Sequence, residues 1–157
     1  MPPATAEPDV RRTKRTTTTA PASEYAEWSY AGYYVADFGS NVNRQLDRIA
    51  SLPKNWDREG APQIDEGIIQ AARSFIAGLP TDIAPVPAVV PSAAGNLQFE
   101  WNAGRRSLEL EIESPSMIHY LKWDPSEGVE EEGTCDIGDT CRAEFLIRWF
   151  MRGAAYV

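Results

Sequence analysis

The chain has 157 residues, of which 43% are hydrophobic and 24% are charged, and its formal net charge at pH 7 is −8. This composition is ordinary for a soluble globular protein and fits one domain with a single core. No apolar run approaches the roughly 18 residues that a membrane-spanning helix needs, and the first residues lack the apolar stretch of a secretory signal. We therefore expect a cytoplasmic protein without a membrane association.

The chain divides into a short basic arm and an acidic body. Residues 1–23 are rich in Pro, Thr and Ala without apolar periodicity, which predicts a disordered arm. Residues 24–157 are expected to form a single globular domain. Residues 21–157 hold 11 of the 15 bases and 21 of the 23 acids, so the body has a net charge of −10. Such a body favours basic partners, whereas the arm could contact a nucleic-acid backbone. The basic residues of the arm are Arg11, Arg12, Lys14 and Arg15.

Aromatic residues are dense just after the arm, between residues 24 and 38. Exposed Trp and Tyr are typical anchors of protein interfaces. The alternative is that these side chains fold back as lids on the core, and the sequence leaves both interpretations open. Our candidate anchors are Trp28, Tyr30, Tyr33 and Tyr34, together with Trp56 in the polar loop 54–62.

Two helices are expected next along the chain. Apolar residues at helical spacing predict the first helix over residues 41–52, with Ser40 or Asn41 as its cap and Pro53 ending it. A longer apolar stripe predicts the second helix over residues 64–78. Asp65 and Glu66 fall in its first turn, where carboxylates favour the helix dipole.

Strands dominate the next part of the chain. Residues 86–90 can form an edge strand, and residues 96–113 alternate apolar and polar side chains around a glycine turn, which is typical of a β-hairpin. A third strand is expected at 117–123, with apolar residues on both faces, and is therefore central or covered on both sides. A fourth strand is an option within 127–132, and a last helix is predicted over residues 143–152. This order indicates an α+β fold with an antiparallel sheet of three to five strands packed against the helices.

The two faces of the predicted hairpin differ in character. The apolar face carries Leu97, Phe99, Trp101, Leu108, Leu110 and Ile112, and the other face carries Gln98, Glu100, Glu109, Glu111 and Glu113. The glutamates have three interpretations: a solvated surface, a docking face for a basic partner, or a carboxylate pair or divalent-metal site. Like charges directly opposite each other in a sheet reduce stability, and a basic partner would relieve that cost.

The remaining reactive residues give no catalytic signature. His119 is the only histidine, and its apolar strand predicts a packed, hydrogen-bonded residue of the core or an interface. Cys135 and Cys141 have a spacing that does not match a metal motif, which leaves free thiols in a loop or a local disulfide. We expect no catalytic residue, no cofactor and no metal site.

The expected function is therefore binding rather than catalysis. A small, acidic α+β protein without a catalytic signature is similar in general design to bacterial immunity proteins, antitoxins, secretion chaperones and phage inhibitors, and the similarity rests on no particular residue. It implies a non-enzymatic module of bacterial or phage origin that docks a basic protein partner through the glutamate face and the aromatic anchors. Two alternatives remain: a nucleic-acid-associated subunit that uses the basic arm, and a carboxylate-based or metal-dependent enzyme.

Overall fold

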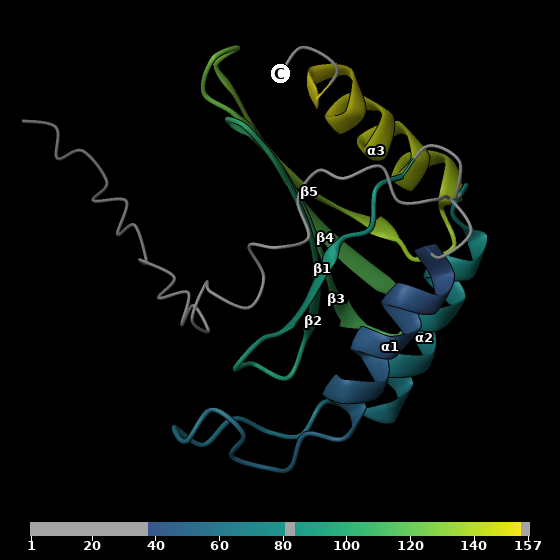
Figure 1. The fold of residues 1–157 in the computed structure, drawn as a ribbon, viewed down its shortest axis with the longest axis vertical. Helices are drawn as coiled ribbons and strands as arrows, with labels where there is room; N and C mark the ends of the chain where they lie inside the picture. Colours follow the sequence, from purple (N-terminus) through teal and green to yellow (C-terminus); the bar gives the residue numbers. More distant parts are fainter. Residues whose placement is uncertain (1–37, 81–83, 155–157) are drawn as a thin grey trace, which may run out of the picture. The chain divides into compact units, whose positions relative to one another are not determined.

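The computed structural model describes residues 38–80 and 84–154, and within these ranges the chain is an α+β protein (Figure 1). The chain forms three helices and a five-stranded antiparallel sheet, and Figure 1 shows the helices on one side of that sheet, which confirms the predicted fold class. No helix in the described ranges has both the length and the apolar character needed to cross a bilayer. The elements in chain order are α1 (Phe38–Ala50), α2 (Glu66–Gly78), β1 (Ala88–Pro91), β2 (Leu97–Ala103), β3 (Arg106–Ser114), β4 (Met117–Asp124), β5 (Val129–Asp136) and α3 (Thr140–Ala154).

Helix α1 begins three residues earlier than the sequence predicts. Its buried stripe is Phe38, Val42, Leu46 and Ile49, and the spacing of four, four and three residues keeps one side of the helix on the core. The predicted caps, Ser40 and Asn41, therefore lie inside the first turn. The helix ends at Ala50, shortly before the proline that cannot continue it.

An aspartate directly precedes each of the helices α2 and α3. Asp65 caps α2 by accepting a hydrogen bond from the backbone N–H of Gly67 at 2.7 Å. Asp139 precedes α3 and accepts from the N–H of Arg142 at 3.0 Å, so α3 begins three residues before the predicted start. Cys141 therefore lies in α3 and Cys135 in β5, and the prediction that both lie in a loop is wrong. Both are free thiols.

The sheet is a meander in which every strand pairs with its sequence neighbours, in the order β1-β2-β3-β4-β5. The predicted hairpin corresponds to β2 and β3, joined by a two-residue turn of Gly104 and Arg105. Gly104 has a φ of 57°. Glycine fits the first position of a tight hairpin turn because a positive φ costs it little. The predicted strand near 86–90 is the edge strand β1, and the optional fourth strand is β5, which runs further than expected.

Strand β4 lies between β3 and β5, but the described helices cover only one of its faces. Its exposure alternates along the strand, with Ile118 and Tyr120 buried and Met117 and Trp123 exposed. The alternative in which this strand is covered on both sides is therefore wrong for the described ranges.

One core lies between the helices and the sheet. Phe99 sits at its centre, with its ring centroid 5.8 Å from that of Phe75 on α2 and 6.3 Å from that of Trp101. Gln45 of α1 ties the edge strand to this layer because its amide accepts from the N–H of Val89 and donates to the carbonyl of Pro87. The six apolar residues predicted for the hairpin are all buried in this core: Leu97, Phe99, Trp101, Leu108, Leu110 and Ile112.

Candidate functional site

The face of the sheet that points away from α1, α2 and α3 is the main candidate, and we call it the open face. In the described ranges no helix packs against it. The strand register aligns its side chains in rows that cross from β2 to β5. Its residues on these strands are Gln98, Glu100, Asn102, Ser107, Glu109, Glu111, Glu113, Met117, His119, Leu121, Trp123, Glu130, Glu132, Thr134 and Asp136. The four predicted glutamates therefore share one face, and β5 adds two more.

Two carboxylates face each other across the centre of the hairpin. Glu100 on β2 is paired directly with Glu109 on β3. The pKa of Glu100 is raised above its usual value because burial disfavours the charged form and because the charge of Glu109 repels it. Gln98 donates a 2.6 Å hydrogen bond to Glu109. The Glu100 carboxylate therefore lies where a proton or a cation would be stabilised.

A second group forms where β3 meets β4. Glu111 is paired with His119, and the register shifts between Ile112 and Ser114, which makes Glu113 an extra residue of β3. Glu111 is only 7% exposed, and Asn96 donates to its Oε1 at 3.0 Å. One ligand atom from each of Glu111, Glu113 and His119 lies within 4.8 Å of the others. These three side chains are the ones in the described ranges that could hold a metal ion.

Strand β4 contributes exposed apolar surface to the same face. Trp123 is 42% exposed and Met117 is 40% exposed, at opposite ends of the strand. Trp123 lies across from Ser107 on β3 and from Glu130 on β5. Large apolar side chains next to carboxylates are a combination typical of protein-binding surfaces, where aromatic residues and Met are enriched. Sequence reasoning missed both side chains, although the alternation of β4 identifies them once Ile118 is assigned to the core.

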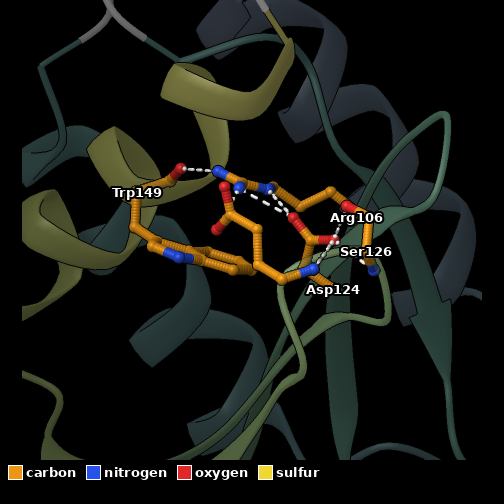
Figure 2. A network of polar contacts seen from close by, with 5 residues as sticks. Arg106, Asp124, Ser126 and Trp149 are labelled. Carbon is orange, nitrogen blue, oxygen red and sulfur yellow. Dashed lines mark hydrogen bonds and ion pairs between the residues drawn. The ribbon is translucent and has the colours of Figure 1, made fainter.

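The opposite, helix-facing side of the sheet is closed at one end by a buried ionic network (Figure 2). Arg106 donates to Asp124 Oδ2 through Nε at 2.7 Å, and its Nη2 lies 2.9 Å from Glu127 Oε2. Its Nη1 donates to the backbone carbonyl of Trp149 at 2.7 Å. Asp124 also accepts hydrogen bonds from the hydroxyl and the N–H of Ser126, and the hydroxyl bond is the main reason that the pKa of Asp124 is lowered. The network ties the end of α3 to the β4–β5 turn.

A second network joins the start of α3 to β4 and β5. Lys122 Nζ lies 2.6 Å from Glu131 Oε2, and Arg142 contacts both Glu131 and the hydroxyl of Tyr120. The hydrogen bond from Lys122 is the largest cause of the lowered pKa of Glu131. Lys122 also lies 4.9 Å from the centroid of the Trp149 ring, within cation–π range.

These two networks act as a structural clamp rather than as a second site. No buried side-chain nitrogen or oxygen in the described ranges lacks a hydrogen-bond partner. Buried charges that are paired and hydrogen-bonded in this way hold elements in place, because separating them would leave an uncompensated charge. The chemistry on the helix side is therefore used within the fold, and within the described ranges the side chains of the open face are the remaining candidates for ligand binding.

Trp56, one of the predicted partner anchors, lies in a loop that the structure describes. It is half-buried, and its indole N–H donates to the carbonyl of Pro62 at 3.2 Å. Asn55 and Arg58 on either side have φ values of 64° and 65°, which non-glycine residues rarely adopt. Asp57 holds the loop by accepting from the N–H groups of Glu59 and Ala61, and these bonds lower its pKa. Trp56 therefore makes a hydrogen bond within its own loop, and its part in partner binding stays a prediction.

His119 is half-buried on the open face rather than inside the core, and its Nε2 lies 3.9 Å from Glu132 Oε2. The other predicted positions lie outside the described residues. These are the aromatic anchors Trp28, Tyr30, Tyr33 and Tyr34 and the basic arm residues Arg11, Arg12, Lys14 and Arg15.

Comparison of the chain with protein-family models, with curated proteins and with solved structures found no match. The residues of the open face are therefore the basis for a functional proposal.

Proposed function

We propose that this chain is a protein-binding module that docks a basic partner on its open face. The observation that carries the proposal is the position of Trp123, which is 42% exposed and lies directly across from Glu130. An indole beside a carboxylate offers a partner's Arg or Lys a ring to stack on and an anion to pair with. Such paired aromatic and charged contacts supply much of the affinity in protein interfaces.

The carboxylates of the face support a basic partner in particular. They come from three strands, β2, β3 and β5, so their combined field covers the face rather than one edge. Complementary charge speeds the encounter between partners and selects against acidic ones. The raised pKa of Glu100 is consistent with this, because a cation placed between Glu100 and Glu109 would remove the repulsion between them.

Apolar anchors complete the docking surface. Met117 and Trp123 together offer a large, adaptable side chain and a rigid aromatic one. The buried network behind the sheet keeps β4 fixed, so these anchors are held in place before binding and little ordering cost remains. In biological terms this is the mode of action of an antitoxin, immunity protein, inhibitor or chaperone-like adaptor of bacterial or phage origin, and we propose that class.

The proposal can be tested with a defined basic probe. An oligolysine peptide titrated into the ¹⁵N-labelled chain should shift the backbone amides of β3, β4 and β5 and leave those of α1 and α2 in place. Trp123→Ala and Glu130→Lys should each weaken this binding, and Glu59→Lys, which makes the same charge change on an exposed loop, should not. Shifts confined to the helices, or equal binding by all three variants, would contradict the proposal.

The natural partner can then be identified with the same variants. Affinity capture from the native host with the wild-type chain, followed by mass spectrometry, should yield a protein with a basic surface. Its affinity for Glu130→Lys should fall and its association should slow with added salt, since electrostatic steering is screened by ions. A partner that binds wild type and Glu130→Lys alike would exclude the open face as its docking site.

A further inference from the structure

Three side chains from two strands converge at one end of the open face. Glu111 and His119 are opposite each other in the β3–β4 register, and Glu113 follows two residues later on β3. A carboxylate oxygen from each glutamate and an imidazole nitrogen lie within 4.8 Å of one another. Groups of carboxylates are common on an acidic surface, and the feature that distinguishes this group is the nitrogen donor of the chain's only histidine.

The β-bulge contributes to this convergence. The register shift between Ile112 and Ser114 makes Glu113 the additional residue on β3. Bulges redirect a side chain relative to the regular pleat and are frequent next to functional sites. Glu111 and His119 are thus aligned across the two strands, and the bulge adds Glu113 as the third donor.

Neighbouring residues contact two of the three candidate ligands, Glu111 and His119. Asn96 donates to Glu111 Oε1 at 3.0 Å, and Glu111 is 7% exposed, so its carboxylate is held rather than mobile. On the other side, Glu132 Oε2 of β5 lies 3.9 Å from His119 Nε2. Metal-binding imidazoles commonly have a carboxylate against the outer ring nitrogen, and metal-binding carboxylates are commonly hydrogen-bonded in turn.

We propose that Glu111, Glu113 and His119 form a binding site for a divalent transition-metal ion, with Zn²⁺ as the ion that fits best. One imidazole and two carboxylates suit Zn²⁺, whereas Mg²⁺ and Ca²⁺ prefer oxygen donors alone. Zinc ligands at about 2.1 Å in a tetrahedral arrangement are roughly 3.4 Å apart. The three donors therefore need only small side-chain rotations to close on one ion, and three protein ligands leave a fourth position for water or a partner's side chain.

The two thiols lie away from this site. Cys135 faces the helix side of β5 and packs against the core, and Cys141 is in the first turn of α3. The site is therefore separated from them by the sheet itself. Since thiolates also bind Zn²⁺, the test is made in a Cys135→Ser/Cys141→Ser background, with the full chain and without a histidine tag.

The single histidine makes the test specific. Zn²⁺ is titrated by calorimetry and, in parallel, the imidazole protons are followed by NMR, where their signals belong to His119 alone. The proposal expects one ion per chain and a shift of the imidazole signals that saturates at one equivalent. Mg²⁺ and Ca²⁺ at tenfold higher concentration should produce neither effect.

Variants locate the ion on the sheet. His119→Gln and Glu113→Gln should each weaken Zn²⁺ binding at least tenfold, while Glu130→Gln, which removes the same charge elsewhere on the open face, should leave it within twofold. Imidazole signals that do not move with Zn²⁺, or variants that all bind like the parent, would overturn the proposal. The NMR result comes from the parent chain, so it stands even if a variant fails to fold.

Discussion

The backbone carbonyl of Trp149 accepts a 2.7 Å hydrogen bond from Arg106, and the guanidinium of the same arginine lies 4.5 Å from the centroid of the Trp149 ring. One side chain from the start of β3 thus holds the last turns of α3 in two ways. A guanidinium can do this because its fork of donors serves a carboxylate and a carbonyl at once.

Arg106→Lys should destabilise the protein although the charge is kept. A lysine can still pair with Asp124, but it cannot also donate to the carbonyl of Trp149. A lost hydrogen bond from a charged group costs about 2 kcal/mol, and for a chain of this size that lowers the melting temperature by roughly 4–8 °C. The neighbouring exposed residue offers a matched control, since Arg105→Lys should change the melting temperature by only about 1 °C, as expected for a surface substitution. Equal melting curves for the two variants would show that the clamp is unimportant.

Gly133 on β5 should not tolerate a side chain. A Cβ built there would lie 2.7 Å from the hydroxyl oxygen of Tyr120 and 2.8 Å from its Cζ. The tyrosine cannot move freely because its hydroxyl contacts Arg142 and Glu131. Gly133→Ala should therefore lower the free energy of unfolding by about 1–3 kcal/mol, the usual cost of overpacking.

The control for this substitution has the opposite sign. A Cβ on Gly39 in α1 meets nothing within 4 Å, so Gly39→Ala should stabilise the protein by up to about 1 kcal/mol through helix propensity. Both values are measured by urea unfolding. A neutral Gly133→Ala would mean that β5 or Tyr120 shifts more easily than the packing indicates.

Stability should depend on pH in opposite directions at two glutamates. The pKa of Glu100 is raised in the folded state by burial and by the charge of Glu109. The contribution of Glu100 to the free energy of unfolding is therefore fully favourable below the pKa that it has in the unfolded chain, and it is lost as the pH rises through the pKa that it has in the folded protein. Glu100→Gln should thus stabilise the protein at pH 7, by up to about 1 kcal/mol for removal of a like-charged cross-strand pair. The gain should disappear at acidic pH.

Glu131 should show the reverse. The pKa of Glu131 is lowered in the folded state, chiefly by the hydrogen bond from Lys122. The contribution of Glu131 to the free energy of unfolding is therefore present above the pKa that it has in the unfolded chain, and it is lost as the pH falls through the pKa that it has in the folded protein. Glu131→Gln should destabilise the protein at pH 7 and have little effect in strong acid. Denaturant unfolding from pH 3 to pH 8 checks both variants, and parallel profiles for the two would contradict the assignment.

The proposed zinc site and the proposed docking face should be coupled. A divalent ion at Glu111, Glu113 and His119 adds positive charge to the face that a basic partner approaches. Saturating Zn²⁺ should therefore weaken oligolysine binding, several-fold at low salt and less at high salt because of screening. Reciprocity requires the peptide to weaken Zn²⁺ binding by the same factor. In the His119→Gln variant, Zn²⁺ should leave peptide binding unchanged, and a persisting effect would place the ion elsewhere.

Local patterning accounts for the part of the fold that is predictable. The alternation in β2 and β3 is regular over both strands, so the amino-acid sequence alone is enough to assign the apolar and glutamate faces of the hairpin. The apolar stripe of α2 similarly locates that helix to within two residues. In both cases the pattern is set by residues that are close together in the chain.

The rest depends on contacts between distant segments. Lys122 and Asp124 face the helix side of β4 because α3 and the β4–β5 turn supply their partners, whereas polarity alone places them on the solvent side. Trp123, on the opposite face of the same strand, is exposed although it is a large aromatic residue. The alternating pattern of the hairpin leaves Arg106 in the turn between the two strands. In the structure Arg106 is the first residue of β3, and its buried ion pair with Asp124 holds it on the helix side of the sheet. The bulge at Glu113 has no signal in a single sequence.

The two borders of the sheet differ in a way that bears on self-association. Exposed strand edges are templates for pairing with another copy of the chain. On β5 the edge carries three consecutive glutamates, Glu130 to Glu132, so two copies that met there would bring their carboxylates together. On β1 the strand is only four residues long, ends in a proline, and has the N–H of Val89 occupied by Gln45. Charge protects one border and a lack of donors protects the other, so within the described ranges neither edge of the sheet offers a ready template for aggregation.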